Sequence, residues 1–185
     1  MSNASHALPA STALAIAQDF IRSVEAKDLD AVTRTLATDA RQLFMHTRRA
    51  KTAEGAAAVI AGRIRGFCVA DIKGRDEVLA YTGNIFTRFV PLVWRDHQWT
   101  VSPNGREVFF HGVGDMIVAR TGRPYKNTYT MRFDIEDGRI IRIAEYGDAL
   151  MFAGLGVRPS RTEIYALLRA VERVFSPGRS SRAGR

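Results

Sequence analysis

Residues 125–156, YKNTYTMRFDIEDGRIIRIAEYGDALMFAGLG, constrain the fold more than any other stretch. Apolar and polar side chains alternate on both sides of the turn sequence EDG at 136–138, which predicts two antiparallel strands joined by a tight loop. Two acids, Glu145 and Asp148, stand where the second strand ends, and a small-residue apolar segment follows. A carboxylate at such a strand end is a candidate for the wall of a pocket.

The first of these strands has one clearly apolar face. Successive side chains of a strand point to opposite faces, so residues of the same parity share a face. The odd-numbered residues carry the bulky side chains and should face the core: Tyr125, Asn127, Tyr129, Met131, Phe133 and Ile135.

The loop between the strands decides which acid faces the core. A three-residue loop at 136–138 would place Glu145 opposite Tyr129 and gather nearly all bulky apolar side chains on one side. A two-residue loop would instead turn Arg142 and Asp148 inward and bury a guanidinium without a visible partner. We therefore predict the three-residue loop, with Glu145 facing the interior.

The sequence around each acid also indicates a further role for it. Asp148 precedes an apolar segment, where an aspartate commonly caps a helix. A bulge at Gly147 would instead turn Asp148 toward the core. Glu145, among apolar side chains, should have a raised pKa, which suits a group that accepts and donates protons.

Helices precede most of the β-structure. Apolar spacing predicts helices near 11–24, 28–36, 50–64, 73–89 and 160–175. Alternating patterns predict strands at 40–46, 67–71, 92–101, 106–119, 125–135 and 139–147. This order indicates an α+β fold in one domain over residues 11–176, with the N-terminal 1–10 and the basic tail 177–185 disordered.

Composition limits the classes of function. The chain is 46% hydrophobic and 25% charged, which is ordinary for a globular protein. The formal net charge is +8, but the arginines are scattered and form no stripe with aromatic residues between them. Nucleic-acid binding is therefore not expected. The single cysteine, Cys68, leaves no partner for an intramolecular disulfide.

Other signals point to a cofactor-free protein of the cytoplasm. No segment approaches the about 18 uninterrupted apolar residues of a membrane span, and the N-terminus lacks the basic start of a signal peptide. His46, His97 and His111 are isolated in the sequence, so no metal site is expected. We therefore expect no membrane contact and no cofactor.

Three motifs match a known pattern. They are GRDEVLA at 74–80, HGVGD at 111–115, and the closing run from YKN at 125 through FDIEDGRI to AEYGDALMFAGLGVRP. Over residues 12–158 the chain resembles the SnoaL-like branch of the NTF2-like superfamily, which includes ketosteroid-isomerase-like and phenazine-biosynthesis A/B proteins. The resemblance implies a cone, in which a strongly curved mixed sheet wraps against helices around a ligand cavity, usually in a homodimer.

The resemblance also implies site residues. In phenazine-biosynthesis A/B proteins a glutamate matching Glu145 and a tyrosine matching Tyr125 lie at the condensation site. In SnoaL-type polyketide cyclases an aspartate matching Asp148 is the acid/base. Two differences from these families argue against the same reaction in this chain. Tyr81 stands where the phenazine proteins have a histidine, and Phe44 stands where ketosteroid isomerases have their aspartate base.

Two tryptophans and the outer sheet face complete the expectations. Trp94 and Trp99 are interpreted as core or dimer-face residues. An outward patch made of Ile140, Tyr146, Val93 and Trp99 would be too apolar for a monomer, so the sequence predicts a homodimer.

The expected function is a cofactor-free acid/base enzyme of the isomerase, cyclase or lyase type, acting on a small hydrophobic carbonyl compound of secondary metabolism. The expected catalytic residues are Glu145, Asp148 and Tyr125. The expected substrate contacts are Tyr129, Asn127, Tyr81, Met131, His111 and Asp115. The alternative is a non-catalytic module that holds a small molecule or a protein in the same cone. The substrate itself is not fixed, since one fold serves many chemistries.

Overall fold

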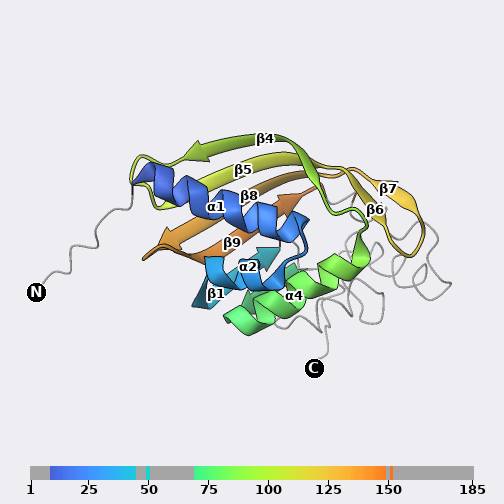
Figure 1. Cartoon of the computed structure of the whole chain (residues 1–185), viewed down its shortest axis with the longest axis horizontal. Helices are drawn as coiled ribbons and strands as arrows, with labels where there is room; N and C mark the ends of the chain where they lie inside the picture. Colours follow the sequence, from blue (N-terminus) through green and yellow to red (C-terminus); the bar gives the residue numbers. More distant parts are fainter. Residues whose placement is uncertain (1–8, 45–48, 51–68, 149–150, 152–185) are drawn as a thin grey trace, which may run out of the picture.

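The computed structural model describes residues 9–44, 49–50, 69–148 and 151. In this part of the chain three helices cover one face of a curved sheet (Figure 1), so the predicted α+β cone is confirmed. The predicted helices at 50–64 and 160–175 and the tail at 177–185 lie outside the described residues.

The helices begin and end where the sequence supplies signals. Helix α1 spans Ala10–Glu25 and buries one stripe of apolar side chains at helical spacing. Helix α2, Leu29–Thr35, is capped by Asp28, whose side chain accepts a hydrogen bond from the Ala31 amide at 2.9 Å. Helix α4, Arg75–Arg88, follows Gly74 at a φ of 91°. Helix α1 starts directly after Pro9, close to the predicted start at residue 11.

The main sheet has seven strands in the order β2-β3-β1-β9-β8-β5-β4. Strand β1 runs parallel to β9, and β2 runs parallel to β3, while the other pairs are antiparallel, so the sheet is mixed. Its strands are Leu36–Phe44 (β1), Arg49–Ala50 (β2), Val69–Lys73 (β3), Trp94–Val101 (β4), Glu107–Gly114 (β5), Thr128–Glu136 (β8) and Arg139–Gly147 (β9).

A short second hairpin replaces the long strand predicted at 106–119. Strand β5 ends at Gly114, and Met116–Val118 (β6) pairs instead with Arg123–Tyr125 (β7). Tyr125 consequently belongs to β7 and not to the strand that carries Tyr129. Both residues still face the interior, as their side chains are buried.

The turn between β8 and β9 has two residues, so the predicted three-residue loop was wrong. Asp137 and Gly138 have φ values of 47° and 73°, and Glu136 pairs with Arg139. Two consecutive residues at positive φ fit the twist of a hairpin, which is why Asp-Gly favours this turn.

A β-bulge follows the turn and restores the predicted facing of β9. Ile135 pairs with Ile140, but Asp134 already pairs with Arg142, so Ile141 is an extra residue in β9. The extra residue shifts the alternation of side chains by one position along the rest of the strand.

The bulge brings Glu145 to the inner face by a route that the sequence reading did not anticipate. Glu145 pairs with Met131 and not with Tyr129, which pairs with Gly147. Arg142, on the outer face, forms an ion pair with Asp134. The repulsive pairing of Arg132 with Arg142 in the predicted register is therefore absent.

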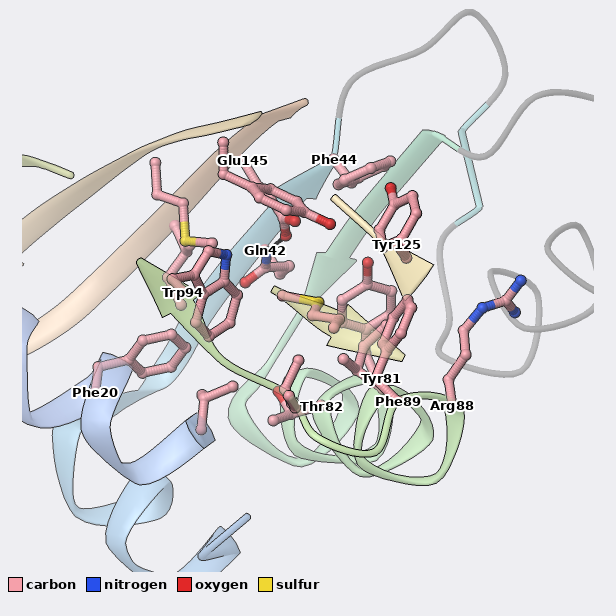
Figure 2. Close-up of a pocket in the computed structure, with 17 residues that line it drawn as sticks. Phe20, Gln42, Phe44, Tyr81, Thr82, Arg88, Phe89, Trp94, Tyr125 and Glu145 are labelled. Carbon is pink, nitrogen blue, oxygen red and sulfur yellow. Dashed lines mark hydrogen bonds between the residues drawn. The ribbon is translucent and has the colours of Figure 1, made fainter. Parts of the chain in front are cut away.

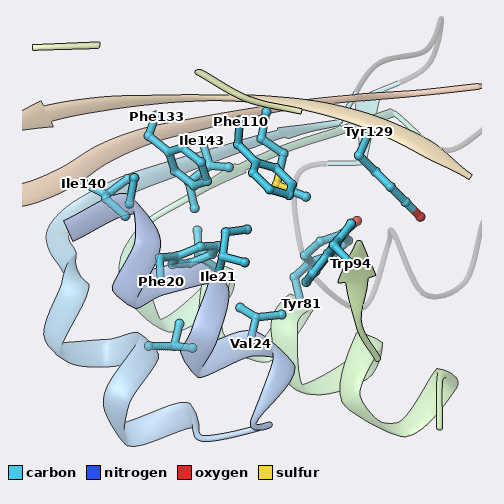
Figure 3. Packing of buried hydrophobic residues seen from close by; sticks show 14 of the residues in the cluster. Phe20, Ile21, Val24, Tyr81, Trp94, Phe110, Tyr129, Phe133, Ile140 and Ile143 are labelled. Atoms are coloured by element: carbon cyan, nitrogen blue, oxygen red, sulfur yellow. The ribbon is translucent and has the colours of Figure 1, made fainter. Parts of the chain in front are cut away.

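The core lies between the helices and the concave face of the sheet. Figure 3 shows Phe20, Ile21 and Val24 of α1 facing the side chains that project from the sheet. The Phe20 ring meets the Phe133 ring edge to face, with centroids 5.5 Å apart. All six residues of the predicted core-facing set, Tyr125, Asn127, Tyr129, Met131, Phe133 and Ile135, are buried.

The apolar patch predicted on the outer face is smaller than expected. Ile140 is completely buried inside. The Trp99 ring packs against the Phe110 ring, with the two centroids 4.7 Å apart. Tyr146 does remain 43% exposed. The correction follows from the two-residue turn, which pairs Ile140 with the inward-facing Ile135. The homodimer stays a prediction.

Two glycines should respond in opposite ways to alanine. A Cβ at Gly112 would lie 2.5 Å from Cζ of Phe110 and 3.3 Å from the carbonyl oxygen of Arg95, and Phe110 is fully buried. We expect Gly112→Ala to lower the free energy of unfolding by about 1–3 kcal/mol through overpacking. Gly83 in α4 has only Leu29 Cδ1 at 3.7 Å, so Gly83→Ala should raise it by about 1 kcal/mol. Urea denaturation measures both changes, and a stabilising Gly112→Ala would contradict this packing.

Candidate functional site

A cavity lies between the concave face of the sheet, the end of α1 and helix α4 (Figure 2). Its wall is mainly aromatic and aliphatic. The polar side chains on it are Gln42, Tyr81, Thr82, Arg88, Tyr125, Tyr129 and Glu145. The cavity has a volume of about 70 Å³. One water needs about 10–15 Å³, so the cavity admits a small molecule.

Glu145 places a carboxyl group in this apolar surrounding. Strand β9 positions it beside Phe44 of β1 and Met131 of β8. Gln42 lies on the inner face of β1 and donates a hydrogen bond from Nε2 to Oε2 of Glu145, at 3.3 Å. Although the residue keeps some exposed surface, burial of its carboxyl raises the pKa of Glu145 to about 7. Both protonation states are thus populated near neutral pH.

Two tyrosines form a hydrogen-bonded pair on the same wall. The Tyr125 and Tyr129 hydroxyls share a hydrogen bond, and Asn127 Nδ2 donates to the Tyr125 hydroxyl at 2.8 Å. Burial, above all, raises the pKa of both phenols, and the charge of Glu145 adds to the rise. The phenols therefore keep their protons and stay hydrogen-bond donors at neutral pH.

Asn127 holds the end of β9 and does not line the cavity. Its Oδ1 accepts from the Asp148 amide at 2.9 Å, and its Nδ2 reaches the Asp148 carbonyl at 3.3 Å. A Cβ at Gly147 would lie 3.0 Å from Asn127 Nδ2. Gly147 therefore permits a close approach, and the β9 bulge lies at Ile141 instead.

In the HGVGD motif Gly114 makes room for the Tyr129 ring and Gly112 for the Phe110 ring. Gly112 and Gly147 are the residues that pair with Tyr129 on the two neighbouring strands. A Cβ at Gly114 would lie 3.1 Å from Cε2 of Tyr129. This strand motif thus has a structural role beside the cavity.

Besides Asn127, three residues expected at the site lie outside the cavity wall. Asp148 is exposed, and its Oδ1 accepts from the Met151 amide at 3.2 Å, as a helix cap does. His111 lies within 3.3 Å of the Thr130 hydroxyl on the outer face.

Asp115 lies where β5 has already ended, and it pairs with Arg95 at 3.3 Å and Lys126 at 3.9 Å. His111, Asp115 and Asn127, which were expected as substrate contacts, therefore do not line this cavity. Tyr81, Tyr125, Tyr129, Met131 and Glu145 do line the cavity together.

Four polar side chains of the wall were not predicted as site residues: Gln42, Thr82, Arg88 and Trp94. Gln42 shares the inner face of β1 with Ala40 and Phe44, and a glutamine at a core-facing position was the signal for it. Trp94 belongs to the core, as expected, and its indole also lines the cavity.

The described part of the chain contains neither a metal-binding group of side chains nor a membrane-spanning helix. No group of three or more His, Cys, Asp or Glu side chains there is placed to hold a metal ion. No helix in the same residues has the length and hydropathy needed to cross a bilayer.

Comparisons with known proteins agree with this fold. The model of the SnoaL-like domain family matches residues 17–143. The structure of a candidate isomerase from Bacillus subtilis has a TM-score of 0.60 at 20% identity, covering 78% of this chain and 92% of that chain. A candidate SnoaL-like polyketide cyclase from Jannaschia sp. CCS1 has a TM-score of 0.60 at 14% identity, covering 86% and 100%.

A third solved structure has a ligand. The protein with a ketosteroid-isomerase-like fold from Catenulispora acidiphila, in complex with trimethylamine, has a TM-score of 0.53 at 10% identity and covers 71% of this chain and 83% of that chain. No protein with a curated description matches the sequence. At these identities the likeness establishes the fold and not the reaction.

Glu145 should make stability depend on pH. Its pKa rises from 4.5 to about 7 on folding, so between these values the folded protein holds a proton that the unfolded chain has released. The contribution of this group to stability therefore falls by about 3 kcal/mol as the pH rises through that window. We expect Glu145→Gln to gain stability over wild type by this amount between pH 4.5 and 7.5, as measured by urea denaturation. The exposed turn residue Glu136, changed to Gln, is the control, and a pH-independent Glu145→Gln difference would refute the burial.

Asp148 should act on stability through its cap. Asp148→Ala removes the acceptor of the Met151 amide and should lower the free energy of unfolding by about 1 kcal/mol. Asp148→Asn keeps an acceptor and should stay within a few tenths of wild type. Equal losses in the two variants, measured by thermal denaturation, would argue against capping.

Proposed function

The chain belongs to the family of SnoaL-like domains, and we propose that it is a cofactor-free acid/base enzyme of the isomerase, cyclase or lyase type. Its substrate is a small hydrophobic carbonyl compound, in secondary metabolism. The observation that carries the proposal is the Glu145 carboxyl, with a pKa of about 7, on the wall of an apolar cavity. The family match ends at residue 143, so the role of Glu145 rests on its surroundings.

In the proposed reaction Glu145 acts first as a base. Its carboxylate removes a proton from the carbon next to the substrate carbonyl, and the electron pair moves onto the carbonyl oxygen as an enolate. Return of the proton to another carbon gives isomerisation. Attack of the enolate on a second carbonyl gives ring closure, and loss of a β-hydroxyl group as water gives dehydration. A pKa near neutrality suits each of these proton transfers.

Neighbouring groups support this role. The hydrogen bond from Gln42 orients the carboxyl, and the apolar wall keeps water from competing for the proton. Tyr125 accepts from Asn127 and adjoins Tyr129, so its position is fixed from two sides. A protonated phenol placed in this way stabilises the negative charge that develops on the substrate oxygen.

A second candidate is a binding module without catalysis. The mostly apolar wall favours it, because apolar contacts alone hold a small hydrophobic ligand. The two candidates differ in whether Glu145 has to titrate.

Substitution of Glu145 separates the two. Mass spectrometry of small molecules that co-purify with the protein supplies a substrate to assay. Glu145→Gln keeps the shape and hydrogen bonding but removes the titration, so kcat should fall about 10²-fold to 10⁴-fold with ligand affinity nearly unchanged. Asp148→Asn, outside the cavity, should retain near-wild-type turnover. Full activity in Glu145→Gln would refute the acid/base role of this residue, and ligand binding without turnover in the wild type would support the binding module. An inactive, stable Asp148→Asn would move the reaction to that aspartate.

The pH dependence of kcat/KM shows whether Glu145 accepts or donates the proton in the limiting step. If Glu145 is the base in the free enzyme, kcat/KM should be low at pH 5, rise with pH and level off above the pKa of about 7. Below that value the slope should be about tenfold per pH unit, because only the carboxylate is active. A profile that instead falls through pH 7 would make Glu145 the acid of the limiting step.

A further inference from the structure

Trp94 carries a hydrogen-bond donor that nothing in the described part of the chain satisfies. The residue is 6% exposed, and its indole Nε1 is buried without a hydrogen-bond partner among the described residues. A buried N–H that has lost its water and gained no acceptor destabilises a folded protein, so it is uncommon. Trp94 also lines the cavity that contains Glu145.

The protein holds the Trp94 backbone with side chains from two other positions. Glu25 Oε1 accepts from the Trp94 amide at 2.8 Å, and His97 Nε2 lies 3.0 Å from the Trp94 carbonyl oxygen. The backbone N–H and C=O of Trp94 thus both have partners, whereas its indole N–H has none among the described residues.

The ring is held by packing alone. The centroid of the Trp94 ring lies 6.3 Å from that of Phe110 and 6.0 Å from that of Tyr129, and both rings are met edge to face. In Figure 2 the indole extends into the cavity, with its nitrogen on the side of Gln42 and Glu145. A phenylalanine would fill an apolar wall without leaving a donor there, so the polar atom calls for an acceptor that enters the cavity.

We propose that Trp94 Nε1–H binds the carbonyl oxygen of the ligand, which makes the occupant a neutral ketone or aldehyde. An indole N–H only donates, so it selects a group with an acceptor atom and rejects groups that only donate, such as ammonium ions. A carboxylate ligand would meet the negative charge of Glu145, whereas a neutral carbonyl would not. The proposal rests on the proposed function for the substrate class, but the hydrogen bond itself needs no turnover.

The placement also suits the reaction. The Trp94 and Tyr129 rings are in contact, and Tyr129 shares a hydrogen bond with Tyr125, so the indole and phenol donors lie on one wall. A donor already in place gains strength when the carbonyl oxygen acquires negative charge as an enolate.

Two probes of nearly equal shape test the proposal on the full chain. Cyclohexanone has a carbonyl oxygen where methylenecyclohexane has a CH₂ group. The chain has two tryptophans, so protein labelled with ¹⁵N-tryptophan gives two indole N–H signals, which Trp99→Phe assigns. Saturating cyclohexanone should move the Trp94 signal downfield by several tenths of a ppm, and methylenecyclohexane should not. The Trp99 signal is the internal control.

Binding to variants gives a second readout. Trp94→Phe keeps an aromatic ring but removes the donor, so the ratio of cyclohexanone to methylenecyclohexane affinity should fall about fivefold to tenfold. In Trp99→Phe this ratio should stay at the wild-type value. Because the two probes share their shape, a general loss of packing would lower both affinities and leave the ratio unchanged.

The outcomes separate this proposal from the enzymatic one. A Trp94 signal that cyclohexanone leaves unmoved, or moves no more than methylenecyclohexane does, overturns the hydrogen bond, as does an unchanged affinity ratio in Trp94→Phe. Full turnover in Glu145→Gln with the ketone-specific shift retained overturns the acid/base function and supports the Trp94 assignment.

Discussion

The β-bulge at Ile141 is the constraint on which the site depends. With the two-residue Asp137-Gly138 turn alone, the regular alternation of β9 would point Arg142 into the core and Glu145 out to solvent. A buried guanidinium needs a partner, and the inner face offers mainly aromatic and aliphatic side chains. The extra residue reverses the alternation, so Arg142 reaches Asp134 on the outer face and Glu145 enters the cavity.

Once Glu145 is inside, the protein bears a cost in stability. A carboxyl group with a pKa of about 7 is less stable ionised in the fold than in the unfolded chain, and the penalty grows toward neutral pH. The hydrogen bond from Gln42 offsets part of it. The indole N–H of Trp94, which has no partner among the described residues, is a second such cost on the same wall. Two unfavourable polar placements in one cavity are more easily explained by a ligand than by folding, since functional sites commonly trade stability for chemistry.

Glycines and one asparagine set the geometry around these groups. Gly114 and Gly147 leave space for the Tyr129 ring and for Asn127, and Gly112 leaves space for the Phe110 ring. Asn127 connects the backbone of Asp148 to the Tyr125 hydroxyl. The end of β9 and the tyrosine pair are therefore positioned together, which couples the strand that carries Glu145 to the donors opposite it.

The sequence by itself determined the elements and their apolar faces, because alternation and helical spacing are local. The core-facing set from Tyr125 to Ile135, the start of a helix near Asp28 and the inward acid Glu145 were all predicted from it. The turn type was misjudged, since a bulge leaves no mark in a run such as GRIIRIAEYG; it forms because Arg142 finds Asp134 on the neighbouring strand. Only the tertiary structure placed His111 and Asp115 away from the cavity, since His111 lies on the outer face of β5 and the chain leaves the main sheet after Gly114. It alone brought Gln42 of β1 and Trp94 of β4 to the wall that holds Glu145, because strands distant in the sequence meet only when the sheet curves around the helices.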